Sequence, residues 1–256
     1  MKAVILAGGY GTRISEKSHL KPKPMIEIGN KPILWHIMKT YSHYGINEFI
    51  ICCGYKGHVI KEYFLNYYKQ MSDMTINLIN NAIEYHKNEV ETWKITLVNT
   101  GIKTMTGGRI KRVKDYIKNE PFMLTYGDGV ADVNLSDLLK FHQDHGKLMT
   151  LTTVQPEARF GVISSNEKGL IEKFKEKPKG DGVWINGGFM VCQPEVINYI
   201  ENDETILEQK PLSNLAKDNE LMSFKHSGFW KPMDTLRDKK QLEELISAGK
   251  APWIKW

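Results

Sequence analysis

The chain has 256 residues, of which 41% are hydrophobic and 25% are charged, and its formal net charge is +5 at pH 7. These fractions are typical of a globular protein and exclude a disordered chain, and the length suffices for a large core. Every apolar run is shorter than the stretch of about 20 residues that a membrane helix needs. The run at residues 1–7 ends at glycines and is too short for a signal peptide. We therefore expect a cytoplasmic protein, and its three cysteines have no metal-binding spacing, Cys52, Cys53 and Cys192.

Apolar strands and amphipathic helices alternate in the first part of the chain. Strands are expected at residues 2–6 and 48–53, and each is soon followed by glycine. Helices are expected at 31–44 and from Val59 to Tyr67, because apolar residues recur there at helical spacing. Near-continuous apolar strands between such helices are typical of a parallel sheet with both faces covered. The pattern predicts an α/β fold.

The pattern is less regular after residue 70, and it becomes richer in strands after residue 148. The further expected strands are at 75–79, 94–98, 121–126, 149–154, 161–164, 170–174 and 184–192. The further expected helices are a basic one at 105–117, then 135–145 and 236–247. No linker or internal repeat divides the chain, so we predict one domain over residues 1–256 with a strand-rich C-terminal part.

A glycine-rich segment, Leu6-Ala7-Gly8-Gly9-Tyr10-Gly11-Thr12-Arg13, follows the first expected strand. Strand ends in such sheets open onto a ligand crevice, and glycines there let backbone N–H groups approach a phosphate. The dinucleotide and P-loop patterns both fail, because Ile14 replaces a glycine and no Gly-Lys-Ser/Thr follows. On glycines alone a flexible turn is the simpler interpretation. Lys21-Pro22-Lys23-Pro24 favours phosphate binding, since its prolines hold a cation near the loop, although a solvated basic turn is the alternative.

Together these segments resemble the signature of the sugar-1-phosphate nucleotidyltransferase family. Further matches to that signature are Gly127-Asp128-Gly129, Glu176-Lys177-Pro178, Asn186-Gly187-Gly188 and Asp234. Within the family the cytidylyltransferase branch is the most similar, on longer segments at 31–38, 50–57, 105–109 and 229–238. The resemblance covers essentially the whole chain, although it is less tight over 65–98 and leucine is usual at the position of Ile14.

The resemblance implies a Rossmann-like, GT-A-like fold with a mixed, mostly parallel sheet flanked by helices. It divides the domain into a nucleotide-binding part, roughly residues 1–130, and a sugar-binding part, roughly 131–256. The implied reaction transfers the cytidylyl group of CTP to α-D-glucose 1-phosphate, giving CDP-glucose and pyrophosphate for CDP-sugar and surface polysaccharide synthesis. It also implies Mg²⁺ as cofactor and a homo-oligomer, either a hexamer or a tetramer.

The resemblance assigns roles to individual residues. The implied catalytic residues are Arg13 and Lys23 on the phosphates, and Asp128 and Asp234 on Mg²⁺. Residues 6–12, Thr104 and Arg109 are implied to lie at the nucleotide, and Glu176, Lys177, Asn186 and Gly187 at the sugar. Each has a structural alternative when taken alone: a Gly-Asp-Gly turn for Asp128, a helix N-cap for Asp234, a surface turn for Glu176 and a basic helix face for Arg109.

The implied reaction needs few ordinary catalytic groups. Its nucleophile is a phosphate oxygen, and a phosphate monoester has a second pKa of about 6, so it is mostly ionised at neutral pH. No general base is therefore required. The barrier lies in aligning two anions, which positioning, cations and a metal ion accomplish. We expect direct in-line displacement with no covalent intermediate.

Three alternatives stay open. UTP or dTTP could replace CTP, because cytosine and uracil differ at one edge and first principles do not decide that choice. A non-catalytic sugar-phosphate sensor is the second alternative, although the paired acids and cations favour an enzyme. Nucleic-acid binding is the third, but the net charge of +5 comes without a long basic tract interleaved with aromatics. We expect no nucleic-acid partner and no membrane partner.

Overall fold

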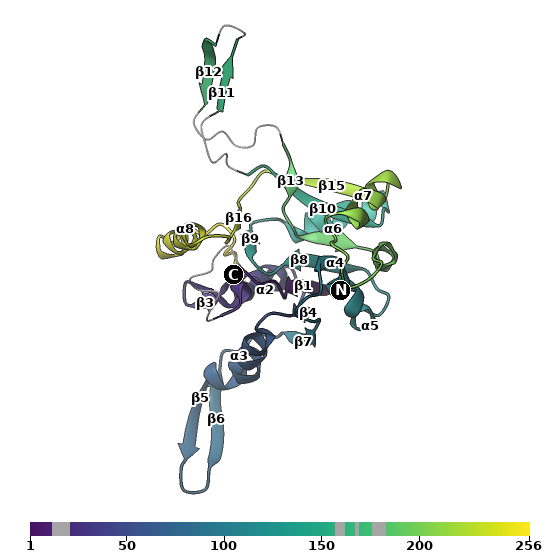
Figure 1. Ribbon diagram of the computed structural model, residues 1–256. Helices are drawn as coiled ribbons and strands as arrows, with labels where there is room; N and C mark the ends of the chain where they lie inside the picture. The colour runs from purple at the N-terminus through teal and green to yellow at the C-terminus, as the bar shows by residue number, and fades with distance from the viewer. Residues whose placement is uncertain (12–20, 157–161, 167–168, 176–182) are drawn as a thin grey trace.

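A computed structural model describes residues 1–11, 21–156, 162–166, 169–175 and 183–256. Four predicted site residues, Thr12, Arg13, Glu176 and Lys177, lie outside these ranges. Within them, eight strands form one large sheet: β1 Lys2–Ala7, β4 Glu48–Cys53, β7 Lys94–Asn99, β8 Phe122–Tyr126, β10 Met149–Val154, β13 Ile185–Asn186, β14 Met190–Cys192 and β15 Leu221–His226. Their order is β13-β10-β14-β8-β1-β4-β7, with β15 also paired to β10 (Figure 1).

The large sheet is mixed but mostly parallel. β1 is parallel to both of its neighbours, β4 and β8, and β4 is parallel to β7. β14 is antiparallel to β8 and β10, β13 is antiparallel to β10, and β15 is parallel to β10. The predicted α/β fold with a mixed, mostly parallel sheet is confirmed.

Helices cover both faces of this sheet. The core on one face includes residues of α2 Ile33–His43, α3 Gly57–Gln70, α6 Leu135–His145 and α8 Leu236–Ser247, of which α8 packs against β2 Glu27–Ile28. The other is covered by α4 Thr106–Arg112, α5 Lys114–Ile117, the 3-10 helix η3 Pro194–Tyr199 and α7 Lys210–Lys217. Neighbouring residues of β1 join different cores: Ile5 packs with the first group and Leu6 with the second. Because strand side chains alternate between faces, this shows a sheet buried on both sides.

Smaller elements lie around the large sheet. In the described ranges these are the 3-10 turn η2 Lys23–Met25 and four antiparallel strand pairs. The pairs are β2 Glu27–Ile28 with β3 Lys31–Pro32, β5 Ser72–Asn77 with β6 Ala82–Asn88, β9 Gly129–Ala131 with β16 Trp230–Pro232, and β11 Val162–Ser165 with β12 Ile171–Lys175.

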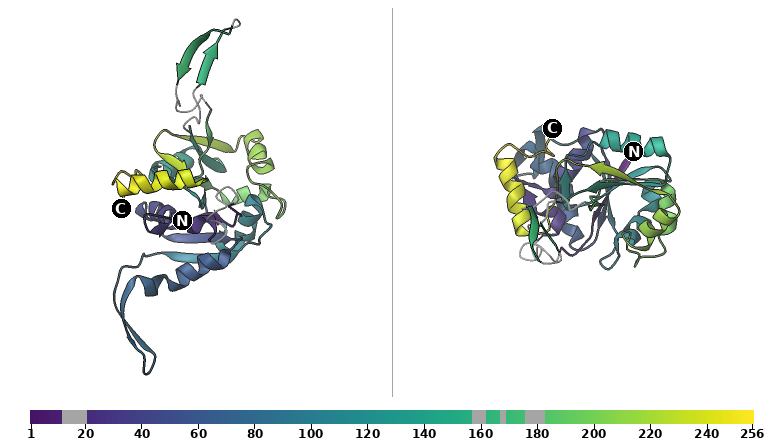
Figure 2. Two further views of the ribbon diagram at one scale, coloured as in Figure 1. Left: turned by 60° about the vertical axis from the view of Figure 1, so that its left-hand side comes forward. Right: turned by 90° about the horizontal axis from the view of Figure 1, so that it is seen from above.

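The β5–β6 pair, residues 72–88, projects away from the body beyond the end of α3, and we call it the projecting hairpin (Figures 1 and 2). Its apolar side chains have little cover in the single chain. Ile76 is 49% exposed, and Leu78 and Ile79 at the tip are 88% and 98% exposed. A two-stranded hairpin is at best marginally stable by itself in water.

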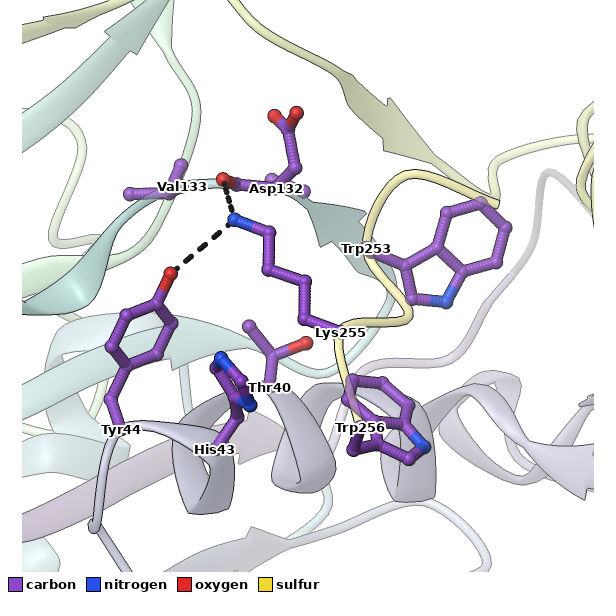
Figure 3. Close-up of a pocket in the computed structure, with 9 residues that line it drawn as sticks. Thr40, His43, Tyr44, Asp132, Val133, Trp253, Lys255 and Trp256 are labelled. Atoms are coloured by element: carbon purple, nitrogen blue, oxygen red, sulfur yellow. Dashed lines mark hydrogen bonds between the residues drawn. The ribbon is translucent and has the colours of Figure 1, made fainter. Parts of the chain in front are cut away.

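The last residues of the chain pack against α2 (Figure 3). Trp253 is buried, and its Nε1 donates to His36 Nδ1 at 3.4 Å, while His36 Nε2 donates to Ile28 O at 2.8 Å. Lys255 Nζ donates to Asp132 O at 2.8 Å and to Tyr44 Oη at 3.3 Å. A small pocket lies between α2 and this segment, and the predicted site residues in the described ranges do not line it.

Several elements differ from the sequence-based expectation. The helix expected at 105–117 is divided at Val113, whose backbone angles of −102° and 9° are not helical. The strand expected at 184–192 is interrupted by two left-handed residues, Gly188 and Phe189, between β13 and β14. The stretch between the strands expected at 75–79 and 94–98 contains a further strand, β6. Periodicity did not predict α7 or β15.

Candidate active site

The site lies where the strand order changes direction. From β1 the chain adds β4 and then β7 on one side, and it next places β8 on the other side of β1. Open α/β sheets bind ligands outside the carboxyl ends of the strands at such a point. Gly8 follows β1 there and Gly127-Asp128 follows β8, and Gly127 N donates to Leu6 O at 2.9 Å. The predicted glycine segment and the first predicted acid therefore lie at adjacent strand ends.

Arg109 lies beneath the glycine segment and is 4% exposed. Its Nη2 donates to Gly8 O at 3.0 Å, and its Nη1 donates to Thr100 Oγ1 at 2.7 Å and Gly101 O at 2.8 Å. Nη1 also lies 3.4 Å from Cys53 O. Burial lowers the pKa of this guanidinium, but arginine stays protonated in proteins. One side chain thus ties together the ends of β1, β4 and β7.

Lys23 lies between the two predicted acids. Its Nζ donates to Asp128 Oδ2 at 2.6 Å and to Asp234 Oδ1 at 2.6 Å. The lysine sits on η2 between Pro22 and Pro24 and is 8% exposed. Burial lowers the pKa of this ammonium, but the two carboxylates outweigh that effect and raise the pKa above its usual value. The ammonium therefore stays charged at neutral pH between the two aspartates.

The β9–β16 pair brings Asp234 beside Asp128. In this pair Pro232 lies opposite Gly129, and Met233 N donates to Asp128 O at 2.8 Å. Asp234 is followed by Thr235, which caps α8 in a capping box with Asp238. The N-cap role that competed with a site role for Asp234 thus belongs to Thr235.

The two carboxylates fit a hard divalent cation. Side chains of Asp128 and Asp234 are 34% and 24% exposed, so both are open to an incoming group. Within the described part of the chain, no cluster of three or more His, Cys, Asp or Glu side chains is suited to a metal. The described residues therefore bring two carboxylates together, and phosphates and water would supply the other ligands of a metal ion at this place. Mg²⁺ is usually held in this way.

Asn186, predicted for the sugar side, is held by its neighbours. Its Nδ2 donates to Tyr126 Oη at 3.0 Å, and its Oδ1 accepts from Gly188 N at 2.9 Å. Tyr126 Oη donates in turn to Glu208, and burial and that carboxylate raise the pKa of the tyrosine. Trp230 Nε1 donates to the backbone of the neighbouring Gly187 at 2.7 Å. Since Tyr126 directly precedes Gly127, this network connects the sugar-side motif with the strand end that carries Asp128.

Sequence reasoning gave no role to Tyr126 or Tyr55, although both lie next to glycine motifs. Tyr55 N donates to Gly8 O at 3.1 Å, and its ring lies 5.3 Å from the ring of Tyr10, centroid to centroid. Tyr10 is 50% exposed and belongs to the glycine segment, so Tyr55 adds a second aromatic ring beside this segment. The sequence feature that could have pointed to Tyr55 is Gly54, which follows β4, the strand beside β1.

The chain matches known proteins over its whole length. A family model described as nucleotidyl transferase matches residues 2–237. The chain belongs to the nucleotidyl transferase family. It is 59% identical to the glucose-1-phosphate cytidylyltransferase of Salmonella typhi and 46% identical to the probable glucose-1-phosphate cytidylyltransferase of Bacillus subtilis, with 100% of each chain covered. The predicted resemblance to the cytidylyltransferase branch is thereby confirmed.

A solved structure extends the likeness to the fold. HddC from Yersinia pseudotuberculosis matches with a TM-score of 0.68 at 22% identity, over 96% of this chain and 99% of that one. In this nucleotidyl transferase, the described contacts bring Lys23, Asp128 and Asp234 together, with Gly8 and Arg109 at the adjoining strand ends. Thr104 is also buried, beside Gly101 in the loop after β7. None of the helices in the described part of the chain is long and apolar enough to span a membrane.

Proposed function

We propose that this nucleotidyl transferase transfers the cytidylyl group of CTP to α-D-glucose 1-phosphate, giving CDP-glucose and pyrophosphate. The observation that carries the proposal is the Lys23–Asp128–Asp234 cluster at the carboxyl ends of β1 and β8. The chain that holds this cluster is 59% identical to a protein named glucose-1-phosphate cytidylyltransferase. A cation and two metal-type ligands at a strand-order switch suit a reaction between two phosphates.

The attacking group needs no base from the protein. The phosphate monoester is mostly dianionic at neutral pH, because its second pKa is about 6. Cys52 and Cys53, at the end of β4 beside β1, are buried, and burial raises the pKa of both thiols. The chain's task is therefore to align two anions and stabilise their charge.

Asp128 and Asp234 would hold Mg²⁺ in this proposal. When bound, the ion offsets charge on the phosphates and on the departing pyrophosphate. Lys23 adds a point charge on the same side, and the backbone N–H groups of residues 8–11 face the triphosphate. Arg109 is proposed to position the glycine segment, because its guanidinium donates a hydrogen bond to Gly8 O. Arg13, outside the described residues, is proposed to bind the triphosphate as a planar fork.

The sugar phosphate is proposed to bind on the far side of Asp128, within the sugar-binding part at about 131–256. Asn186 and Gly187 would face the glucose ring, with the Asn186 side chain oriented by Tyr126. Glu176 and Lys177, outside the described residues, are proposed for the glucose hydroxyls and the 1-phosphate. Residues 1–130 would form the nucleotide-binding part, with Thr104 near the base.

Pyrophosphate release tests the proposal directly. CTP, UTP and dTTP are each combined with glucose 1-phosphate, mannose 1-phosphate and galactose 1-phosphate. We expect the highest kcat/KM for CTP with glucose 1-phosphate. A preference for UTP or dTTP would keep the reaction class and change the nucleotide. Binding of glucose 1-phosphate without release of pyrophosphate for any pair would indicate the sugar-phosphate sensor instead.

We further propose that the protein works as a homo-oligomer, a hexamer or a tetramer, in which the projecting hairpin lies against other subunits. The exposure of Ile76, Leu78 and Ile79 on an isolated two-stranded element supports this proposal. Light scattering after size-exclusion chromatography tests it. We expect Leu78→Ser with Ile79→Ser to lower the oligomer mass, whereas Tyr116→Ser, at an exposed position on α5, leaves it unchanged. An unchanged mass for the hairpin variant would contradict the proposal.

A further inference from the structure

Lys23 occupies the point at which the two acids of the proposed metal site converge. Its Nζ is 2.6 Å from Asp128 Oδ2 and 2.6 Å from Asp234 Oδ1, so one ammonium bridges both carboxylates. A divalent cation bound by the same two oxygens would need to lie between them as well, at about 2.0–2.1 Å for Mg²⁺. The ammonium and the cation cannot share this position, on grounds of both space and charge.

We propose that the Lys23 ammonium takes the place of the metal ion in the nucleotide-free protein, and that it must leave both carboxylates before a divalent cation binds to them. The inference rests on the proposed metal role of Asp128 and Asp234. It adds that Lys23 has two alternative sets of partners: the two carboxylates when no ligand is present, and the phosphates when the nucleotide is bound.

The backbone of Lys23 restricts where its ammonium can move. Pro22 and Pro24 flank the residue, Lys23 begins η2, and Met25 N donates to Pro22 O at 2.8 Å. The backbone therefore stays fixed while the side chain rotates. The side chain is 10% exposed, so an ammonium that left both carboxylates without meeting another anion would stay desolvated and unpaired.

A bound triphosphate supplies that other anion. The glycine segment that is proposed to hold it begins at Leu6, and Gly127 N donates to Leu6 O. A Cβ atom on Gly127 would lie 3.2 Å from Pro24 Cγ, so the lysine turn, the end of β1 and the Asp128 strand end are in contact. Release of Lys23 is thus favourable only with phosphate present. Metal and nucleotide then bind with positive coupling, and each raises the affinity for the other by the same factor.

The experiment measures Mn²⁺ binding to the full-length protein without nucleotide, by electron paramagnetic resonance of the free ion and by titration calorimetry. Lys23→Met removes the ammonium and keeps an unbranched side chain, so we expect it to bind Mn²⁺ roughly tenfold or more tightly than the unmodified protein. Lys23→Arg keeps the charge and is expected to bind Mn²⁺ as weakly as the unmodified protein. Adding Asp128→Asn to Lys23→Met should abolish the gain.

A matched variant separates occupation of the site from general electrostatics. Lys231 lies on β16 three residues before Asp234 and pairs with Asp238 at 3.3 Å, so Lys231→Met removes the same charge from a neighbouring place. We expect its Mn²⁺ affinity to stay within about twofold of the unmodified protein. Equal gains in Lys231→Met and Lys23→Met, or no gain in Lys23→Met, would overturn the proposal.

A second measurement covers the case in which the carboxylates of Lys23→Met repel each other and weaken the fold. We expect Mn²⁺ to raise the thermal unfolding temperature of Lys23→Met by more than it raises that of the unmodified protein. The opposite order would contradict the proposal. Neither measurement uses nucleotide or turnover, so the result is independent of whether CTP is the substrate.

Discussion

The guanidinium of Arg109 fills the space that a side chain on Gly8 would need. A Cβ atom built on Gly8 would lie 2.1 Å from Arg109 Nη1, and one on Gly54 would lie 2.5 Å from the same atom. The glycine at the end of β1 is therefore required by packing against a buried arginine, in addition to any approach of a phosphate. The neighbouring Gly9 has no atom within 4 Å of its Cβ position.

This contrast predicts opposite effects for adjacent substitutions. Gly8→Ala should lower the free energy of unfolding by about 2–4 kcal/mol, because the guanidinium must leave its carbonyl partners or the strand end must shift. Gly9→Ala should leave stability within about 1 kcal/mol. Chemical denaturation of both variants measures the difference. Equal stability of the two would show that Arg109 adapts freely and that packing does not require the glycine.

Arg109→Met should destabilise the fold and weaken nucleotide binding together. The substitution removes the donors to Gly8 O, Thr100 Oγ1 and Gly101 O, and we expect a loss of about 2–4 kcal/mol in the free energy of unfolding. Arg112→Met is the matched control on the same helix, because Arg112 is exposed and pairs with Asp203 at the surface. It should cost no more than about 1 kcal/mol. Similar losses for both variants would argue against the role of Arg109 at the strand ends.

Asp128→Asn and Asp234→Asn should each lower kcat by about two orders of magnitude or more while the protein stays folded. An amide carries no charge to offset that of a divalent cation, so phosphate charge would be left uncompensated. Steady-state kinetics at limiting Mg²⁺ measures the effect, with circular dichroism as the check on folding. Asp137→Asn, in the first turn of α6, should keep full activity. Full activity of either site variant would remove that aspartate from the metal site.

Acid should destabilise the fold through His142. This side chain is 1% exposed and lies 2.8 Å from Thr150 Oγ1 and 2.9 Å from Gln193 Nε2. Burial and the neighbouring His145 lower the pKa of His142 to about 4. Below the ordinary histidine pKa of about 6.5, His142 is protonated in the unfolded chain but stays neutral in the folded protein. The free energy of unfolding therefore falls as the pH drops from about 6.5 towards 4.

The size of this effect can be measured by denaturation at different pH values. His142 should contribute about 2 kcal/mol of lost stability between pH 7 and pH 5. His142→Gln cannot take up the proton, so its stability should fall less over the same range. A variant with the same pH dependence as the unmodified protein would assign the acid sensitivity to other groups, such as His36, whose pKa burial also lowers.

Direct displacement makes a kinetic prediction. Exchange of labelled pyrophosphate into CTP should require glucose 1-phosphate or CDP-glucose, because no cytidylyl-enzyme forms. The rate should also fall as the pH drops through the second pKa of the sugar phosphate, about 6, since the protonated phosphate is the poorer nucleophile. Rapid exchange with CTP alone would reveal a covalent intermediate.

The elements with regular packing could be predicted from sequence. Helices α6 and α8 begin and end where their patterns predicted, because each has apolar residues at helical spacing and a polar cap, Asn134 and Thr235. β6 could not be predicted, since its side chains are largely exposed and follow no hydrophobic period. Its formation depends on pairing with β5, and periodicity carries no information about such an exposed pair.

The candidate site likewise has features that the sequence could predict and features that it could not. Motifs predicted Lys23, Asp128 and Asp234 as site residues from residue type and neighbouring glycine or proline, and the structure places the three side chains together. The motifs did not predict that one lysine bridges both acids, which depends on the β9–β16 pairing of distant segments. The contacts of Arg109 with backbone carbonyls could not be predicted either, because every residue has a backbone carbonyl and the partner's side chain does not indicate the contact. They depend on the parallel register of β1, β4 and β7.

The projecting hairpin leaves and rejoins the body at nearly one point. Glu89 N donates to Met71 O at 3.0 Å, so the chain on either side of the hairpin is already closed by a hydrogen bond. We therefore expect that a longer, shorter or deleted hairpin leaves the parallel register of β4 with β7 unchanged. If the hairpin joins subunits as proposed, changes in this segment would alter their association while the strand ends of the proposed active site stay as they are. Descendants of one ancestral fold can diverge in quaternary structure while they keep the same reaction.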